Sequence, residues 1–512
     1  MEESVSERTT GRKILKGTIV IILVSVFAKI TAFFSEALLA NYLGTSYQSD
    51  AYYMVSSIQQ VFYPMLSVGV WKVFLPVYKD RITQKKMDEA SAVANKTITL
   101  LTIVSILFVV FIWVFNDVVV RIIAPGFSDE TRVLCAELVR ISSPMYLFVI
   151  IAAVYASMLQ CHNKFWGSQI REVATHIPTI LVAILCYNVW GVKALAVALI
   201  LGGLVRLLVE LPFVDWGYRF RPDFSLKDTQ FIVMIKRLPS ALLSEGVTQF
   251  NTLIDKVMAS SLPTGAVSSL NYGHRLMNVF SGLLSSAIAT AMYPQMVELI
   301  SLKKQDVLAQ LMEKTIRLFF ITMVPISIAC IVFRTELVTL VYQRGAFGTD
   351  STIITSSVFA LYSVGLLFVA CSTVLNNLFY GYGDTKTPMI ISVVHLIVNV
   401  VLNLVLVWYM GVNGLALATS LSAIVTTGVR YVLCGRYIIM NGKVLLYYAL
   451  KIGFVSCFSC IGAYLLVSAL FDSMLVRLVI GAVLGVSSYC VLLKVLHVDE
   501  LNELIKIIRR KK

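Results

Sequence analysis

The sequence predicts an all-α polytopic membrane protein, and three observations carry this prediction. Fourteen long apolar stretches cover the chain from about Leu15 to Leu496. Hydrophobic residues make up 58% of the 512 residues and charged residues 14%, with a mean hydropathy of +0.82. Each stretch is close to the ~20 residues that a helix needs to span a bilayer. A water-soluble protein of this length cannot bury so much apolar surface, so we expect fourteen transmembrane helices.

The predicted spans follow one another with short polar turns, and no connection is long enough to hold a soluble domain. The first span contains Lys29 and Glu36 and lacks a small-residue cleavage pattern, so we do not expect a cleaved signal peptide. The spans begin near Lys16, Asp50, Ala92, Val133, Ser168, Val192, Ile232, Gly265, Leu311, Thr352, Lys386, Val412, Val444 and Ser473.

The net charge of +14 follows from basic residues gathered in alternate loops. Membrane proteins place such loops in the cytoplasm, and the alternation holds along the whole chain only if the number of spans is even. We therefore expect both termini in the cytoplasm and no nucleic-acid partner. Residues 497–512 form a basic, amphipathic tail that we expect to rest on anionic lipid.

An internal repeat divides the chain. Gly191–Ala198 matches Gly411–Ala418 at an offset of 220, and the same offset relates Ala124–Phe127 to Arg344–Phe347. This offset spans six helices, an even number, so the two copies have the same orientation in the membrane. The prediction is two six-helix lobes in a parallel pseudo-twofold repeat plus two C-terminal helices, an arrangement found in transporters. The predicted boundaries are 1–218 for helices 1–6, 219–440 for helices 7–12, 441–496 for helices 13–14 and 497–512 for the tail.

Charged side chains inside predicted spans are unfavourable in a bilayer and usually face a cavity. They gather in spans 1, 2, 7 and 8, which correspond under the repeat. Lys29 and Glu36 are seven residues apart, hence on one face of a helix, and we expect both to face a cavity. The structural alternative, a charge at a helix end, applies most directly to Asp50 and Lys72.

Oxygen-bearing side chains in spans 7, 11 and 12 suggest a cation site. Asn399 and Asn403 lie four residues apart, Thr419 lies one turn into the next span, and Asp255 lies in span 7. Such ligands suit a hard cation such as sodium, although Asn and Thr also join helices in membranes. The chain has no nucleophile-elbow, zinc-protease or Walker signature, so we expect no enzyme activity, and no cofactor other than this ion.

Four stretches of this sequence resemble the MurJ (MviN) family of lipid II flippases, within the multidrug/oligosaccharidyl-lipid/polysaccharide exporter superfamily. They are Ser49–Tyr53, Ala124–Phe127, Gln343–Phe347 and Phe379–Pro388. The resemblance covers almost the whole chain, and it also includes Leu270–Leu276. It implies a cationic cavity for a pyrophosphate head group and a groove in helices 13 and 14 for the lipid tail.

The resemblance also implies individual site residues. Arg275 matches an arginine of helix 8, Glu36 matches an acid of helix 1, and Lys29 replaces an arginine. With His274 and Asp50 they form the predicted substrate site. Three positions depart from the family pattern: Ser35 replaces an arginine, Gln59–Pro64 replaces a basic motif, and His274 replaces an acid. The family's sodium ligands fall on Asp255, Asn399, Asn403, Leu415 and Thr419, where Asn403 replaces a carboxylate.

We therefore expect a flippase for an undecaprenyl-pyrophosphate-linked cell-wall precursor, with lipid II favoured, working by alternating access. The expected partners are this lipid-linked oligosaccharide and membrane lipids, and the expected state is a monomer in the bacterial cytoplasmic membrane. Three alternatives remain open: a flippase for another lipid-linked polysaccharide precursor, a cation-coupled multidrug exporter, and a membrane scaffold without transport activity.

Overall fold

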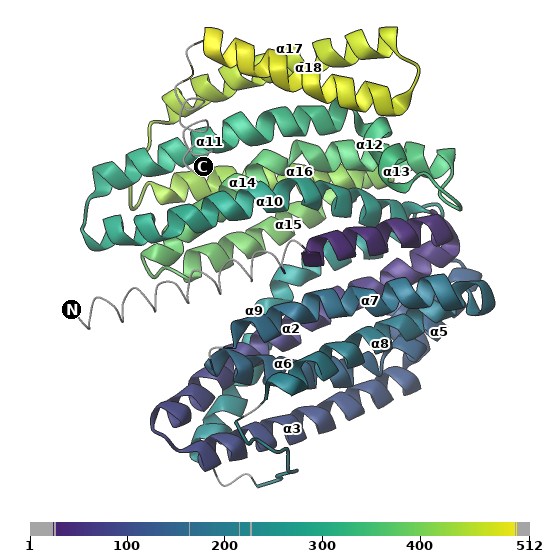
Figure 1. The fold of residues 1–512 in the computed structure, drawn as a ribbon, viewed down its shortest axis with the longest axis vertical. Helices are drawn as coiled ribbons and strands as arrows, with labels where there is room; N and C mark the ends of the chain where they lie inside the picture. The colour runs from purple at the N-terminus through teal and green to yellow at the C-terminus, as the bar shows by residue number, and fades with distance from the viewer. Residues whose placement is uncertain are drawn as a thin grey trace. The chain divides into compact units, whose positions relative to one another are not determined.

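The computed structural model describes residue 24 and residues 27–162, 164–214, 216–225, 228–496 and 498. Within these residues every long regular element is a helix and no strand occurs (Figure 1). This confirms the predicted all-α fold class. The contacts divide the chain into two compact units, Met1–Val267 and Ser268–Lys512. The predicted amphipathic tail at 497–512 lies outside the described residues, apart from Val498.

The first unit contains a helical segment over residues 27–43 followed by eight α-helices and a short 3₁₀ turn among its described residues. They are α2 (Tyr47–Thr83), α3 (Met87–Val114), α4 (Asn116–Ile123), α5 (Asp129–Ser142), α6 (Met145–Cys161), α7 (Phe165–Trp190), α8 (Val192–Glu210), η1 (Leu211–Phe213) and α9 (Thr229–Ala259).

The second unit contains nine α-helices among its described residues, the first of which begins at the end of the first unit. They are α10 (Ala266–Ser301), α11 (Gln305–Val332), α12 (Arg334–Tyr342), α13 (Thr349–Val364), α14 (Leu366–Gly381), α15 (Lys386–Met410), α16 (Val412–Cys434), α17 (Gly442–Leu470) and α18 (Met474–Val495).

Polar caps fix where several helices begin. The hydroxyls of Ser46 and Ser128 accept hydrogen bonds from backbone N–H groups in the first turns of α2 and α5. The carboxylate of Asp228 and the side chain of Asn441 do the same for α9 and α17. These are the residue types that satisfy unpaired N–H groups at helix starts. The apolar runs seen in the sequence therefore become separate helices with defined first residues.

The apolar surface of the helices identifies a multi-pass membrane protein. Ten helices of the described part are long and apolar enough to span a membrane, or eleven if the bent pair α5 and α6 forms one span. Large apolar side chains such as Val189, Trp408 and Phe454 are more than two-thirds exposed, which a bilayer accommodates. Helices α9 and α10, with 31 and 36 residues, are also long enough to span a bilayer but are not among these ten. The count of fourteen stays a prediction.

The internal repeat is visible in the backbone. Gly191 and Gly411, at the predicted offset of 220, both have a positive φ, +57° and +55°, and each separates two antiparallel helices. Lys85 and Lys303 are the two described non-glycine residues with positive φ, at +60° and +55°, and each lies in the turn after a long helix. Residues other than glycine rarely adopt a positive φ. Matching elements in the two units therefore share their turn geometry as well as their order. In the structure α9 packs on α2 and belongs to the first unit. The predicted domain boundaries stay predictions.

The connection between η1 and α9 packs onto the first unit rather than extending into solvent. The Tyr218 hydroxyl donates to Asn95 Oδ1 at 2.7 Å, and the rings of His162 and Trp216 stack with centroids 3.8 Å apart. At its end, Asp228 Oδ2 lies 2.7 Å from Arg81 Nη2 at the end of α2. These contacts fix the start of α9 beside the end of α2.

The helices α17 and α18 form a hairpin that packs on α11 of the second unit. Tyr448, Ile452 and Tyr489 are buried in a cluster with Ile321. Pro325 interrupts α11, and a proline removes the N–H that would bond to the carbonyl four residues earlier. That carbonyl belongs to Ile321, and it accepts a hydrogen bond from the Tyr489 hydroxyl at 2.9 Å.

Candidate functional site

Lys29 and Glu36, the two candidates of the first span, lie in different surroundings. Both belong to the helical segment 27–43 of the first unit. Lys29 is exposed, whereas Glu36 is buried beside the buried Ser35. A buried acidic side chain is unfavourable in a membrane protein and usually marks a functional position. Glu36 therefore has the surroundings expected of a functional acid in a membrane protein, and Lys29 is accessible to a ligand.

Asp50 holds a turn of the first unit. It is buried, and its Oδ2 accepts a hydrogen bond from the backbone N–H of Gly265 at 2.7 Å. Gly265 has a φ of +94°, and a side chain there would meet Thr45. The carboxylate thus joins the start of α2 to the turn before α10. This geometry gives Asp50 a structural role, and its part in substrate binding stays a prediction.

His274 and Arg275 are neighbours on α10 of the second unit but differ in their contacts. The His274 ring packs edge-on against Tyr362 with centroids 5.4 Å apart, and its Nδ1 lies 3.3 Å from Nδ2 of Asn278. Arg275 is exposed. The histidine is thus fixed by packing, and the guanidinium is accessible.

Four of the five predicted sodium ligands lie together in the second unit. Asn399 and Asn403 are fully buried on α15, and Asn403 Nδ2 donates to Asn399 Oδ1 at 3.1 Å. The Thr419 hydroxyl of α16 lies 3.4 Å from Asn399 Nδ2 and donates to the carbonyl of Leu415 at 3.1 Å. This is a compact group of oxygen atoms of the kind that hard cations bind.

The fifth predicted ligand, Asp255, lies on α9 of the first unit, where it is buried. Among the described residues no group of three or more His, Cys, Asp or Glu side chains could hold a metal ion. The donor set predicted for sodium therefore consists of amide, hydroxyl and carbonyl oxygens with Asp255 as its one carboxylate. The part of Asp255 in the predicted sodium site stays a prediction.

The polar group at Asn399 extends further along α15 and α16 than the sequence analysis predicted. His395 lies one turn before Asn399, and its Nδ1 is 3.2 Å from the hydroxyl of Thr426. One turn further along α16, Arg430 Nε donates to Asn376 Oδ1 of α14 at 3.0 Å. The spacing of 395, 399 and 403 would have predicted this continuous polar stripe.

A buried arginine of the first unit was also missed. Arg206 and Glu210 are four residues apart on α8, and both are buried. The Arg206 guanidinium carbon lies 3.9 Å from the centre of the Tyr63 ring, close enough for a cation–π contact. An arginine and a glutamate one turn apart inside an apolar span would have identified this pair.

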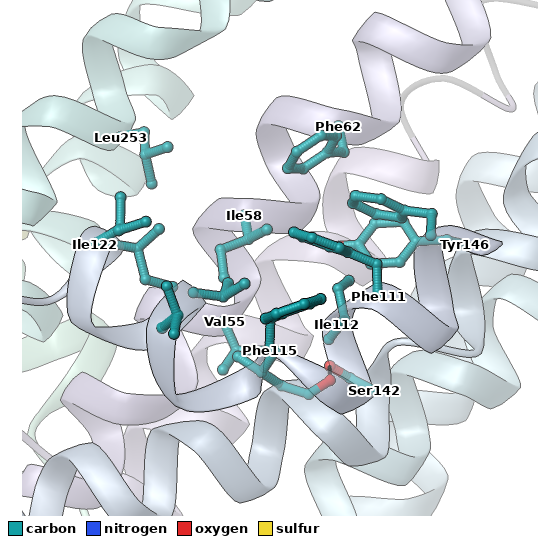
Figure 2. Close-up of a pocket in the computed structure, with 15 residues that line it drawn as sticks. Val55, Ile58, Phe62, Phe111, Ile112, Phe115, Ile122, Ser142, Tyr146 and Leu253 are labelled. Atoms are coloured by element: carbon teal, nitrogen blue, oxygen red, sulfur yellow. Dashed lines mark hydrogen bonds between the residues drawn. The ribbon is translucent and has the colours of Figure 1, made fainter. Parts of the chain in front are cut away.

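The first unit also contains an apolar pocket of about 260 Å³, which Figure 2 shows. Phe62 comes from α2 and Phe111 from α3, Phe115 lies between α3 and α4, Ile122 comes from α4, and Leu253 comes from α9. No charged side chain lines it, and Ser142 and Tyr146 supply its polar groups. An engineered apolar cavity of about 150 Å³ binds benzene, so this pocket can accept part of an apolar chain. It cannot bind a charged head group.

Asp384, in the stretch Phe379–Pro388 noted in the sequence, accepts three hydrogen bonds. Its Oδ1 accepts hydrogen bonds from the N–H groups of Lys386 and Thr387, and its Oδ2 accepts one from the Tyr437 hydroxyl at 3.0 Å. These hydrogen bonds, led by those from Thr387, lower the pKa of Asp384 below its ordinary value. The carboxylate orders the turn before α15 and ties it to the segment after α16.

Many apolar spans, an internal duplication and buried polar side chains within the spans together define a secondary transporter. Comparison with known proteins identifies the kind of transporter. The family model described as lipid II flippase MurJ matches residues 39–483. This chain belongs to the MurJ lipid II flippase family.

Relatives and solved structures agree with this assignment. The chain is 26% identical over 416 residues to the probable lipid II flippase MurJ of Buchnera aphidicola subsp. Baizongia pistaciae, covering 80% of this chain and 81% of that protein. It is 27% identical over 445 residues to the probable lipid II flippase MurJ of Vibrio cholerae, covering 83% of each.

Two solved structures share the fold. A structure of lipid II flippase MurJ in an inward closed conformation matches with a TM-score of 0.81 and 21% identity, over 94% of this chain and 100% of that one. An inward-facing multidrug resistance transporter of the MATE family matches with a TM-score of 0.68 and 15% identity, over 81% and 96%.

Proposed function

We propose that this protein is a flippase that moves an undecaprenyl-pyrophosphate-linked cell-wall precursor, lipid II, across the bacterial cytoplasmic membrane by alternating access. The observation that carries the proposal is the family match along most of the chain, together with the high similarity in fold to a solved MurJ. The buried Glu36 and the accessible Lys29 and Arg275 support it, because a pyrophosphate needs cationic donors in surroundings of low dielectric.

In the proposed orientation both termini lie in the cytoplasm, and the protein works as a monomer without catalysing a covalent reaction. The turns with Lys85 and Lys86 and with Lys303 and Lys304 support this orientation, because basic loops stay in the cytoplasm. The energy for transport would come from an ion gradient or the membrane potential. The oxygen group at Asn399, Asn403, Leu415 and Thr419, with Asp255, is the proposed place for a sodium ion.

A second candidate function is a flippase for another lipid-linked polysaccharide precursor. The replacement of basic family positions by Ser35 and by the stretch Gln59–Pro64 supports it, because both changes remove positive charge from the proposed site. The lower structural similarity to a multidrug exporter makes drug transport the less favoured alternative.

The test is complementation of a bacterial strain in which MurJ can be depleted, with lipid II measured at the outer leaflet. Restored growth and restored exposure of lipid II would support the proposal. A well-expressed protein that inserts in the membrane but restores neither would overturn lipid II as the cargo. Exposure of a different undecaprenyl-linked glycan in the same cells would favour the second candidate.

A further inference from the structure

A second pocket of the first unit lies between α2 and α9, at the ends of these helices that Arg81 and Asp228 join. Its volume is about 360 Å³. Two basic side chains line it, Lys72 from α2 and Arg237 from α9, together with the carboxylate of Asp80. Valine, proline and methionine side chains of both helices form the walls between these groups. Neither Lys72 nor Arg237 was among the predicted site residues.

The helical repeat explains how the pocket is built. Lys72, Pro76 and Asp80 are spaced four residues apart, so they follow one face of α2, and Thr229, Val233 and Arg237 follow one face of α9 in the same way. The end of α2 and the start of α9 are adjacent, so these faces run in opposite directions. Lys72 lies eight residues from Asp80, and Arg237 lies eight residues from Thr229. Both cations therefore sit about 12 Å along their helices from the polar rim.

The rim of the pocket is held in place by a partly buried ion pair. Arg81 Nη2 lies 2.7 Å from Asp228 Oδ2 and also donates to Gln230 Oε1 at 3.3 Å. Arg81 Nη1 donates to the carbonyl of Glu89 at the start of α3 at 3.2 Å. One guanidinium thus connects α2, α3 and α9 next to the pocket, which keeps the two walls at a fixed separation without a ligand.

The charge and size of the pocket select the ligand. Two cations and one carboxylate give the lining a net charge of +1, since 2 − 1 = 1. A phosphodiester carries one negative charge and balances this lining, whereas a pyrophosphate carries more. The volume is at the low end of the roughly 300–1,000 Å³ typical of small-molecule sites, too small for a disaccharide–peptide head group.

We propose that this pocket is a binding site for the phosphodiester head group of an anionic membrane phospholipid, held by Lys72 and Arg237. The bound lipid would brace α2 against α9, the two helices that the Arg81–Asp228 pair already joins. None of the predicted substrate-site residues lines this pocket, and the proposal does not depend on the identity of the transported precursor.

The experiment measures the retention of phosphatidylglycerol by the purified full-length protein, by native mass spectrometry and by the shift in thermal unfolding temperature as the lipid is added. Phosphatidylcholine serves as the zwitterionic comparison. Lys72→Gln and Arg237→Gln should each weaken phosphatidylglycerol binding by about tenfold, because each removes one charge-assisted contact. Lys236→Gln is the matched control, since Lys236 is an exposed cation next to Arg237 that does not line the pocket.

A variant that binds phosphatidylglycerol more tightly separates an effect on the pocket from a loss of binding caused by misfolding. Asp80→Asn removes the one carboxylate of the lining and should tighten phosphatidylglycerol binding. Equal losses in Lys236→Gln and Arg237→Gln would show a diffuse surface attraction and overturn the proposal, as would wild-type retention in both pocket variants. Stronger retention of undecaprenyl pyrophosphate than of phosphatidylglycerol would overturn the choice of ligand. Lipid retention is measured without transport, so its result is independent of the complementation test.

Discussion

The Tyr489 hydroxyl donates a hydrogen bond to the carbonyl oxygen of Ile321 at 2.9 Å, and Ile321 lies four residues before Pro325. A tyrosine of α18 thus replaces the helical hydrogen bond that a proline removes from α11. Within a bilayer no water is present to satisfy such a carbonyl. The hairpin of α17 and α18 is therefore joined to the rest of the second unit by a hydrogen bond to the backbone of α11 as well as by apolar packing.

We expect Tyr489→Phe to lower the stability of the protein by about 1 kcal/mol, the size of a hydrogen bond between helices in a membrane. The measurement is thermal unfolding of the purified protein in detergent. Tyr447→Phe is the matched control, because Tyr447 is a largely exposed tyrosine of the same hairpin. In a Pro325→Ala background the N–H of residue 325 can bond to Ile321, so Tyr489→Phe should then have little effect. Equal losses in both backgrounds would contradict this explanation.

Stability in acid should depend on the ion pair between Arg81 and Asp228. Burial alone would raise the pKa of Asp228, but the N–H of Phe231 and the charge of Arg81 together lower it below its ordinary value. The pair therefore stabilises the fold fully above the unfolded-state pKa of about 3.9, and this contribution is lost as the pH falls toward the lower pKa of the folded state.

Asp228→Asn keeps a good helix cap but removes the ion pair, so we expect a loss of about 1–3 kcal/mol at neutral pH and a flatter stability profile below about pH 4. Thermal unfolding between neutral pH and pH 3 measures both. Asp223→Asn, in the same connection but outside the ion pair, should leave the profile unchanged. A wild-type acid profile in Asp228→Asn would mean that other carboxylates control acid stability.

Arg275→Ala should abolish translocation while the protein still inserts and folds. The side chain is accessible on α10 and is the cation that the proposed pyrophosphate contact requires. Losing a charge-assisted contact costs about 1.5–3 kcal/mol. Complementation with lipid II measured at the outer leaflet tests this, and Arg334→Ala, which removes an exposed cation from the start of α12, is the control. Normal growth with Arg275→Ala would remove Arg275 from the site.

Lys29 should contribute its charge rather than a particular shape, since it is exposed and lies seven residues before Glu36. We expect Lys29→Glu to inactivate transport and Lys29→Arg to be tolerated in the same complementation assay. If both variants support growth as well as the wild type, Lys29 faces lipid or another part of the protein.

Sodium binding should depend on Asp255, the one carboxylate of the proposed ligand set. Binding to the folded state raises the unfolding temperature, so sodium should stabilise the wild-type protein more than potassium does. Asp255→Asn should abolish the difference, and Asn403→Asp should enlarge it by adding a second negative charge beside Asn399. Equal responses to sodium and potassium in the wild type and in Asn403→Asp would mean that no such site exists.

The fold class and part of the site could be predicted because they depend on spacing along the chain. Asn399, Asn403 and Thr419 lie on two consecutive helices joined at Gly411, so a one-turn spacing was enough to group them. The repeat was visible because a positive φ at Gly191 and Gly411 restricts the residue type at both positions.

Other contacts depend on how helices rotate against one another, which hydropathy does not determine. The Asp50–Gly265 hydrogen bond joins residues 215 positions apart, and it shows that a charged residue at a helix start holds a turn in place. The Arg206–Tyr63 contact and the pocket between α2 and α9 arise from packing among segments that are remote in the chain. No periodicity of a single helix could have predicted them.

The turn residues Lys85 and Lys303 share more than their left-handed backbone. Each is followed by a second lysine, so the two halves repeat the same basic dipeptide at the same tight turn. In the proposed orientation these basic dipeptides keep their loops on the cytoplasmic side during membrane insertion. Each half of the chain then carries its own topological determinant, and neutralising one dipeptide would leave the other to fix the direction in which its half enters the membrane.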